Sequence, residues 1–340
     1  MLKRKLKKLY FRFGGHLFKT APLLLSYQLP KTLVIEATNQ CMLRCRVCAT
    51  VNNPIRSKGV MSLELFNQIL NQIDWSIKRI NFSYAGEPLI NKDIFKMVKL
   101  AGKKGIPSII ETNGMLLERC VDELLVSGLS KLNIALDGVS QESISKYREG
   151  INFTTVMLGI KDIVNKRDRL GLKKPEIHLQ FIVMKHNEGE MKMAMEIAKE
   201  IGVDFIDLKS MILSGGIWLS ESERNRFASE FLPENEEFKR YQLINGSWVL
   251  KNQLAGFCPY VIPGMVVIMW NGDVTICTMD VNGQFVIGNI REKSLRLIWR
   301  DNKYTELRKK ILKRELKECR ECAYLVDHYA SIKIKEGFAH

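Results

Sequence analysis

The chain has 340 residues, of which 46% are hydrophobic and 26% charged, a composition typical of a globular protein with a large core. This composition excludes a disordered chain, a repeat array and a low-complexity protein. The formal charge of +15 indicates an anionic partner, such as an anionic small-molecule substrate. Specific nucleic-acid binding is not expected, because the basic residues form no recognisable nucleic-acid module.

The N-terminus is basic and apolar at once. Seven Lys and Arg residues lie in residues 1–20, interleaved with Leu, Phe and Tyr, and no acid precedes Glu36. This mixture fits a basic amphipathic segment on an anionic membrane surface, and equally a solvated helix packed on the main domain. No apolar stretch approaches the ~20 residues that a membrane span needs. We therefore expect a cytoplasmic protein in which residues 1–30 form a separate segment able to touch a membrane.

Three cysteines follow a strand predicted by the apolar, β-branched run Thr32–Thr38. Cys41, Cys45 and Cys48 have the spacing C-x3-C-x2-C, of which roughly 0.004 copies are expected by chance. Three thiolates in one loop can bind three corners of a four-iron cluster and leave one iron open. A zinc site is the alternative, but it needs a fourth ligand, and no Cys or His lies between Cys48 and Cys120.

After this loop, strand-like and helix-like segments alternate. Further strands are predicted at residues 79–84, 108–112, 131–136, 176–184 and 204–209. Helices are predicted at residues 61–75, 94–105, 116–127, 154–169 and 187–201. Six strands joined by helices predict an α/β fold, a parallel sheet with helices outside that curves into a partial (β/α)6 barrel over residues 31–213. In such barrels the reacting groups gather at the carboxyl ends of the strands.

The second half of the chain has a different pattern. Residues 214–257 mix Gly, Ser and charges and are interpreted as a linker with a helix or two, before a small domain over residues 258–325 and a tail over residues 326–340. Two apolar runs flank Asn271-Gly272, a strong hairpin signal, and a helix is predicted over residues 295–313. Four cysteines of this half can ligate a four-iron cluster or a zinc ion equally well. They are Cys258, Cys277 (on the second strand of the hairpin), Cys319 and Cys322.

A strand followed by C-x3-C-x2-C resembles the signature of the radical S-adenosylmethionine (SAM) superfamily. The resemblance implies that the open iron binds the amino and carboxylate groups of SAM, and that an electron cleaves SAM to methionine and a 5′-deoxyadenosyl radical. One position departs from the family pattern. The residue before the third cysteine is usually aromatic and here is Val47, which implies altered packing under the adenine.

Motifs at three strand ends also resemble SAM-binding motifs of this family. Residues 85–88 resemble G-G-E-P, which receives the methionine amino group, while residues 112–114 and 135–138 resemble T-N-G and S-L-D-G. Arg148 matches the family arginine that pairs with the SAM carboxylate. Ala135 replaces a serine, and losing its hydrogen bond costs about 1 kcal/mol. Turns would explain each motif taken alone. The resemblance implies cofactor binding by Ala85, Gly86, Glu87, Pro88, Asn113, Asp137 and Arg148.

The C-terminal cysteines resemble the auxiliary-cluster domains named SPASM and Twitch. The residues that carry this likeness are Cys258-Pro259, Cys277, Gly288-Asn289, Trp299 and Cys319-x2-Cys322. A full SPASM domain continues with three more cysteines, whereas here only His328 follows nearby, so the likeness is to the shorter Twitch form. The resemblance favours iron over zinc and implies two 4Fe–4S clusters, one that binds SAM and one auxiliary.

An auxiliary cluster with four cysteine ligands has no open iron, which suggests electron transfer. Twitch-type relatives oxidise a secondary alcohol. The resemblance therefore implies an oxidoreductase or epimerase of a sugar- or cyclitol-like alcohol, phosphorylated or lipid-linked given the basic charge. It also implies an electron donor such as flavodoxin or ferredoxin. The alternatives are a maturase of a ribosomally made peptide and a non-enzymatic iron–sulfur redox or scaffold protein.

No catalytic residue is assigned from the sequence. Tyr84, His178 and Lys209 lie at or in predicted strands and are candidates for a substrate base, although each is also compatible with core packing. Cys120 is the remaining cysteine. It is predicted to be a buried thiol in the helix over residues 116–127, outside the barrel, which disfavours an epimerase that uses a free cysteine.

Overall fold

The computed structural model describes residues 29–52, 55–73, 76–213, 219–251, 258, 261, 264–320, 322 and 329–335. The basic segment over residues 1–20, Pro259 and His328 lie outside the described residues, as do parts of the predicted linker and tail. All of the predicted cysteine ligands and SAM-binding residues lie within the described part. None of the described helices is long and apolar enough to cross a membrane.

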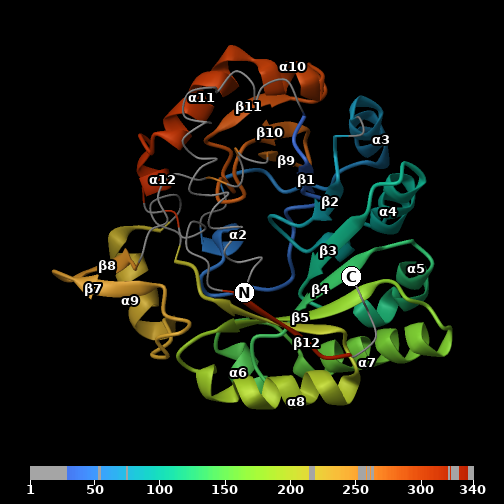
Figure 1. Cartoon of the computed structure of the whole chain (residues 1–340), viewed down its shortest axis with the longest axis vertical. Coiled ribbons are helices and arrows are strands. Elements are labelled where there is room, and N and C mark those ends of the chain that lie inside the picture. The colour runs from blue at the N-terminus through green and yellow to red at the C-terminus, as the bar shows by residue number, and fades with distance from the viewer. Residues whose placement is uncertain are drawn as a thin grey trace, which may run out of the picture.

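One curved sheet organises the described part of the chain (Figure 1). Its strands follow the order β11-β10-β9-β1-β2-β3-β4-β5-β6-β12. Strands β1 to β6 are parallel to one another and lie in chain order, as predicted. They are β1 (Thr32–Ile35), β2 (Arg79–Phe82), β3 (Ser108–Thr112), β4 (Lys131–Ala135), β5 (Glu176–Val183) and β6 (Phe205–Ser210).

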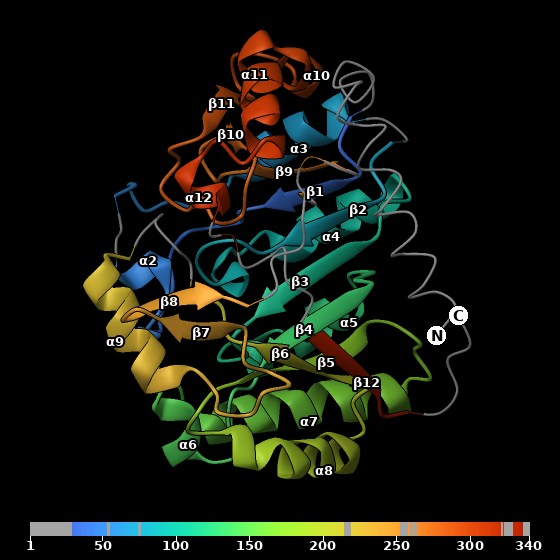
Figure 2. The same ribbon diagram turned by 60° about the vertical axis from the view of Figure 1, so that its left-hand side comes forward.

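Helices connect the parallel strands and, apart from the short α2 of the cysteine loop, lie along the outer face of the curved sheet (Figure 2). Alternate side chains of each strand face these helices, so Leu179 and Phe181 of β5 are buried in the core, while His178 and Gln180 face the inner side. This arrangement confirms the partial (β/α)6 barrel. The connecting helices are α2 (Ala49–Asn52), α3 (Leu63–Gln72), α4 (Ile94–Lys103), α5 (Val121–Leu125), α6 (Gln141–Ser145), α7 (Phe153–Arg169) and α8 (Met191–Ile201). Short 3₁₀ turns are η2 (Pro88–Ile90), η3 (Leu117–Arg119) and η4 (Glu188–Glu190).

Two predicted helices are interrupted. The segment predicted over residues 116–127 is the 3₁₀ turn η3 followed by α5, and Cys120 lies at their junction rather than inside a helix. The segment predicted over residues 295–313 divides into α10 (Leu295–Arg300) and α11 (Asn302–Leu312). The break lies at Asp301, whose extended backbone lets its carboxylate accept a hydrogen bond from the Lys303 amide at 2.8 Å and begin a new helix. A short helix, α12 (Lys317–Arg320), follows.

The C-terminal hairpin extends the barrel sheet. Strand β9 (Met265–Ile268) pairs in parallel with β1. Strand β10 (Asp273–Thr275) pairs antiparallel with β9, and β11 (Val286–Asn289) pairs antiparallel with β10. The predicted turn at Asn271-Gly272 is present, with Gly272 at φ +93°. The prediction that Cys277 lies on the second strand is wrong. The strand ends at Thr275, because the chain turns there and the Asp280 amide donates to the Cys277 carbonyl at 3.1 Å.

Regular structure also occurs in the segments interpreted as linker and tail. Residues 214–257 contain α9 (Glu221–Phe231), which begins with a capping box between Ser220 and Glu223, and the hairpin of β7 (Tyr241–Ile244) and β8 (Ser247–Leu250). Strand β12 (Tyr329–Lys333) pairs antiparallel with β6 at the far edge of the barrel sheet. The final segment of the chain therefore takes part in the main sheet.

Candidate active site

The loop that carries Cys41, Cys45 and Cys48 begins just beyond the carboxyl end of β1. Backbone hydrogen bonds attach this loop to the segment around residue 148, from the Arg44 amide to the Glu149 carbonyl at 2.9 Å and from the Arg46 amide to the Tyr147 carbonyl at 3.0 Å. The Leu43 amide points at the Cys41 sulfur at 3.4 Å. The loop is thus held at both sides with its thiols half-buried.

Burial raises the pKa of Cys41, and that of Cys45 to about 11, because a thiolate loses hydration inside the protein. The three thiols also interact with one another electrostatically, and the nearby Arg148 guanidinium, 4.0 Å from the Cys45 sulfur, favours the thiolate. Clustered soft sulfur donors with a cation beside them fit an iron–sulfur cluster, in which iron replaces the thiol protons.

Residues 85–88 form a tight loop against the cysteine loop. Gly86 has φ +75°, and a Cβ there would lie 2.7 Å from the Gln40 carbonyl oxygen, so only glycine fits. The amide of Glu87 donates to the same carbonyl at 2.7 Å. This contact holds the predicted methionine-binding loop directly against the first cysteine.

The carboxylate of Glu87 is buried and fully engaged by the chain. It accepts hydrogen bonds from the Thr112 hydroxyl at 2.7 Å, the Asn113 amide at 2.7 Å and the Leu89 amide at 3.1 Å. Burial raises its pKa, and these donors oppose the rise. Glu87 therefore joins the ends of β2 and β3, and it brings the Asn113 side-chain amide to 3.7 Å from the Cys41 sulfur.

Asp137 and Arg148 form a buried ion pair at the end of β4. The Arg148 Nε and Nη2 atoms lie 2.7 and 2.6 Å from the same Asp137 oxygen, and the other oxygen accepts from the Ile182 amide at 2.7 Å. Asp137 and Arg148, both predicted to bind SAM, are thus joined to each other, and Arg148 also approaches Cys45. A buried, hydrogen-bonded pair of this kind is a rigid support for a ligand.

The four C-terminal thiols are also neighbours. Cys277 is affected electrostatically by Cys258, Cys319 and Cys322, and burial raises the pKa of Cys319 to about 12. The Met279 amide points at the Cys277 sulfur at 3.4 Å. A four-iron cluster takes each thiol on a different iron, so these donors fit a cluster.

A polar network connects the two cysteine sites, and the sequence did not reveal it. The Arg56 guanidinium pairs with the buried Glu36 at the end of β1 and donates from Nε to the Val281 carbonyl at 2.6 Å. The Tyr84 hydroxyl donates to the Asp280 carbonyl, and Tyr84 has φ +104°, a strained backbone for a non-glycine residue. The sequence signal for this network was Glu36, a single acid within the apolar run Thr32–Thr38.

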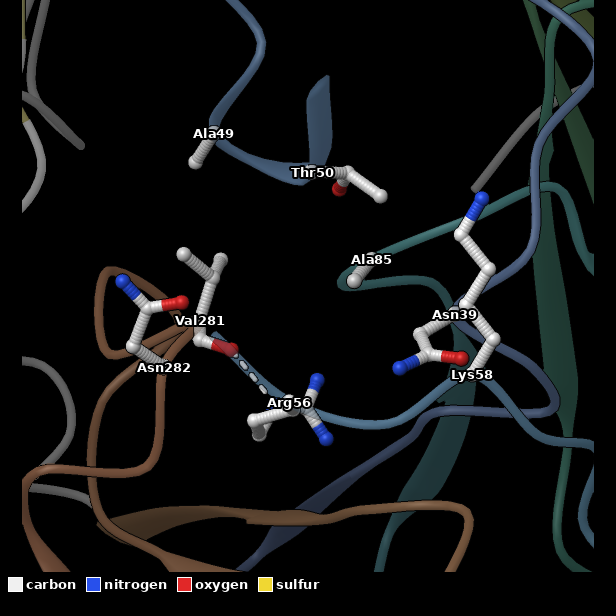
Figure 3. Close-up of a pocket in the computed structure, with 8 residues that line it drawn as sticks. All are labelled: Asn39, Ala49, Thr50, Arg56, Lys58, Ala85, Val281 and Asn282. Atoms are coloured by element: carbon white, nitrogen blue, oxygen red, sulfur yellow. Dashed lines mark hydrogen bonds between the residues drawn. The ribbon is translucent and has the colours of Figure 1, made fainter. Parts of the chain in front are cut away.

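A small pocket, partly open to solvent, lies between the same segments (Figure 3). Figure 3 shows Ala49 and Thr50 from the helix after Cys48, Ala85 from the methionine-binding loop, and Val281 with Asn282 from the segment after Cys277. Asn39, Arg56 and Lys58 complete the lining. The pocket thus lies between the two cysteine loops and carries two cationic side chains.

The inner face of the barrel is polar. His178 lies between two carboxylates, with Nδ1 at 3.1 Å from Asp207 and Nε2 at 3.1 Å from Glu176, and its ring stacks on Phe205 at 4.4 Å. The Ser331 hydroxyl of β12 donates to Asp207 at 2.5 Å. Lys209 lies on the same face of β6, since it is two residues from Asp207. Tyr84, the third candidate for a substrate base, lies instead in the polar network between the two cysteine sites. Cys120 is half-buried and lies outside the barrel.

Comparisons with known proteins agree with this fold and these sites. Residues 35–216 match the model of the radical SAM superfamily, and residues 258–323 match that of SPASM, an iron–sulfur cluster-binding domain. The chain belongs to the radical SAM superfamily. Its radical SAM domain binds a 4Fe–4S cluster and SAM, and its SPASM domain binds auxiliary iron–sulfur clusters.

Curated relatives have several activities. A tungsten-containing aldehyde ferredoxin oxidoreductase cofactor-modifying protein of Pyrococcus furiosus is 27% identical over 309 residues, which cover 82% of this chain and 83% of the relative. A probable GTP 3′,8-cyclase of Methanococcus aeolicus is 29% identical over 216 residues, 62% of each chain.

Among solved structures, BtrN in complex with AdoMet and 2-DOIA has a TM-score of 0.55 at 19% identity and covers 87% of this chain and 94% of its own. Streptococcus suis SuiB bound to precursor peptide SuiA has a TM-score of 0.62 at 16% identity, covering 85% and 70%. At these identities the likeness concerns the fold.

Proposed function

We propose ligand assignments for both clusters. The SAM-binding cluster is held by Cys41, Cys45 and Cys48, and one auxiliary cluster by Cys258, Cys277, Cys319 and Cys322. The SAM contacts come from residues 85–88, Asn113, Asp137 and Arg148. Three of these contacts reach the cysteine loop, at Gln40, Cys41 and Cys45, which supports a single site.

We propose that the enzyme removes hydrogen from an alcohol carbon of a small, hydroxyl-rich substrate, and so oxidises or epimerises it. When bound, the two clusters and SAM supply the hydrogen-abstracting radical and an electron acceptor. The observation that carries this proposal is the polar inner face of the barrel, where His178, Asp207 and Glu176 form one hydrogen-bonded group. Such side chains bind hydroxyl groups well and apolar groups poorly.

Further side chains support the same substrate class. Asn133, on β4 beside His178 in the register, is 93% buried and its side-chain oxygen has no hydrogen-bond partner among the described residues. An acceptor of this kind needs a donor such as a hydroxyl. At the other end, Lys58 offers an ammonium group to an anionic substituent of the substrate.

The test is anaerobic reconstitution followed by a substrate screen. We would incubate wild type with SAM, a reductant and a panel of carbon-deuterated cyclitols and sugar phosphates, and measure deuterium in the 5′-deoxyadenosine formed. Deuterium transfer from an alcohol carbon is expected for wild type and not for a Cys41/Cys45/Cys48→Ala variant. 5′-Deoxyadenosine formation without deuterium from any alcohol in the panel would contradict the substrate class while leaving SAM cleavage intact.

A second candidate is modification of an organic cofactor or nucleotide. The match to the Pyrococcus furiosus cofactor-modifying protein, over 82% of this chain, favours it. The same screen separates the two candidates if it includes GTP and a reduced pterin. Label transfer from GTP or the pterin alone would select the second candidate.

A further inference from the structure

The surface beside the auxiliary cysteines is strongly basic. Residues 303–320, which include all of α11 but its first residue and the whole of α12, hold eight Lys and Arg residues against three Glu residues. Figures 1 and 2 show α10 and α11 at the β11 end of the sheet with α12 following them, and α10 lies beside the barrel helix α3, where the Leu295 amide donates to the Gln72 side chain at 2.9 Å. We define the basic face by its accessible members, Lys303, Lys309, Lys310, Lys313, Lys317 and Arg320.

Part of this charge has no ion pair among the described residues. Lys309 pairs with Glu306 at 2.7 Å and Lys313 with Glu315 at 3.7 Å, both exposed pairs of small energy. Lys310 and Lys317 are exposed, and neither has an ion pair within the described part of the chain. The face therefore projects a net positive field into solvent.

The basic face adjoins a predicted cluster ligand. Cys319 lies within α12, between Lys317 and Arg320, and its amide donates to the Leu316 carbonyl at 3.1 Å. Cys319 and Cys322 are half-buried, so this ligand pair lies close to the surface that carries the charge. Arg308, by contrast, is buried against Trp299 and Tyr304, so it anchors α11 and leaves the lysines on the outer side.

Resting on the auxiliary-cluster ligands proposed above, we propose that the basic face is the docking surface for an acidic one-electron carrier protein that exchanges electrons with the auxiliary site. In the exchange one electron leaves the reduced auxiliary cluster and one electron reduces the carrier, and no covalent bond forms or breaks. A small anionic substrate is disfavoured here because the charges lie on the outer surface of helices, whereas the pocket of Figure 3 lies between the cysteine loops. An acidic protein surface complements six distributed cations and gains in association rate from them.

The test compares two charge-reversed variants of the reconstituted holoenzyme. Lys310→Glu/Lys313→Glu/Lys317→Glu alters the basic face, and Lys92→Glu/Lys99→Glu/Lys103→Glu makes the same change of charge on and beside α4, on the barrel helices. Iron content and thermal unfolding establish that both variants are loaded and folded. The probe is an acidic flavodoxin, and its binding affinity is measured at several salt concentrations. Stopped-flow experiments measure oxidation of the reduced auxiliary cluster by flavodoxin and by neutral free riboflavin.

We expect the basic-face variant to lose at least about tenfold in flavodoxin affinity and electron-transfer rate at low salt, with the difference shrinking as salt increases. The α4 variant should stay close to wild type, and riboflavin should oxidise all three proteins equally. An unchanged flavodoxin rate or an equal loss in both variants would overturn the proposal.

Discussion

Single residues at the carboxyl ends of the strands determine how the cysteine loop is held. Gly86 is one of them, because its backbone conformation is left-handed and its missing Cβ leaves room for the residues before Cys41. Glu87 is another, because one buried carboxylate joins two strand ends through three hydrogen bonds. Both belong to a motif that the sequence associates with SAM, and in the structure both act on the chain itself.

A matched pair of glycine substitutions tests the close approach at Gly86. Gly86→Ala should abolish SAM binding, because the new Cβ meets carbonyl oxygens of the cysteine loop. Gly105 also has a positive φ, +70°, but open space around it, so Gly105→Ala should cost only about 1 kcal/mol in stability and leave SAM binding intact. Isothermal titration of SAM into the reconstituted proteins measures the difference. Equal SAM affinities would refute the steric argument.

Tyr84 is the residue-scale connection to the auxiliary site. Tyr84→Phe removes the hydroxyl that donates to the Asp280 carbonyl, three residues after Cys277, and should cost about 1 kcal/mol of stability. We expect the electron paramagnetic resonance signal of the auxiliary cluster to change and that of the SAM-binding cluster to stay the same. Ser127→Ala removes a buried hydroxyl that donates to the Leu124 carbonyl at 2.6 Å, outside this network, and serves as the control. A variant signal identical to wild type would show that the hydroxyl does not position the Cys277 segment.

At the scale of elements, buried ion pairs attach helices to the ends of strands. Arg167 near the end of α7 is 1% exposed and pairs with Asp204 before β6, and it also donates to the Pro175 carbonyl at 3.0 Å before β5. Lys166, its neighbour in the same helix, pairs with the exposed Asp122. The Arg167 ion pair is thus buried, whereas the ion pair of the adjacent Lys166 lies at the surface.

Substituting these two cations should have very different effects. Arg167→Met leaves the Asp204 carboxylate buried without its cation and should lower the free energy of unfolding by about 3–5 kcal/mol. Lys166→Met removes a surface pair and should cost less than about 1 kcal/mol. Urea denaturation of both variants gives the comparison. Similar losses would mean that the Arg167 pair is worth no more than a surface pair.

Most strands and helices of the barrel could be predicted from the sequence, but the strand pairings at the two ends of the sheet could not. Alternation of apolar residues and the spacing of cysteines predicted six parallel strands and both cysteine groups. The pairing of β9 with β1 joins residues more than two hundred positions apart, and no local pattern encodes it. Likewise β12 was missed because a short strand at a sheet edge looks like a polar tail. Arg56 and Glu36 were missed because an ion pair between loop and strand has no sequence period.

At the scale of the whole molecule, the two cysteine sites belong to one sheet. Strand β9, which leads toward Cys277, pairs with β1, which leads to Cys41. The network through Tyr84 and Arg56 then joins the segments beyond these strands. The barrel and the C-terminal hairpin therefore form one structural unit that shares a sheet.

The shared sheet predicts how the protein unfolds. We expect calorimetry of the holoenzyme to give a single cooperative transition, since loss of β9 exposes an edge of the barrel sheet. Removing iron with a chelator under reducing conditions should lower the transition temperature, because the clusters bind the folded chain. Two separate transitions for residues 31–213 and 258–325, assigned by hydrogen exchange, would contradict a shared unit.

The same pairing has a consequence for the order in which the protein can be made. A ribosome completes β1 to β6 long before it reaches β9, so throughout that interval β1 presents an unpaired edge rich in Leu, Val and Ile. Exposed strand edges recruit other strands and promote aggregation. A chain ending before residue 265 should therefore accumulate in inclusion bodies, and it should become soluble when residues 258–335 are supplied as a separate polypeptide in the same cell.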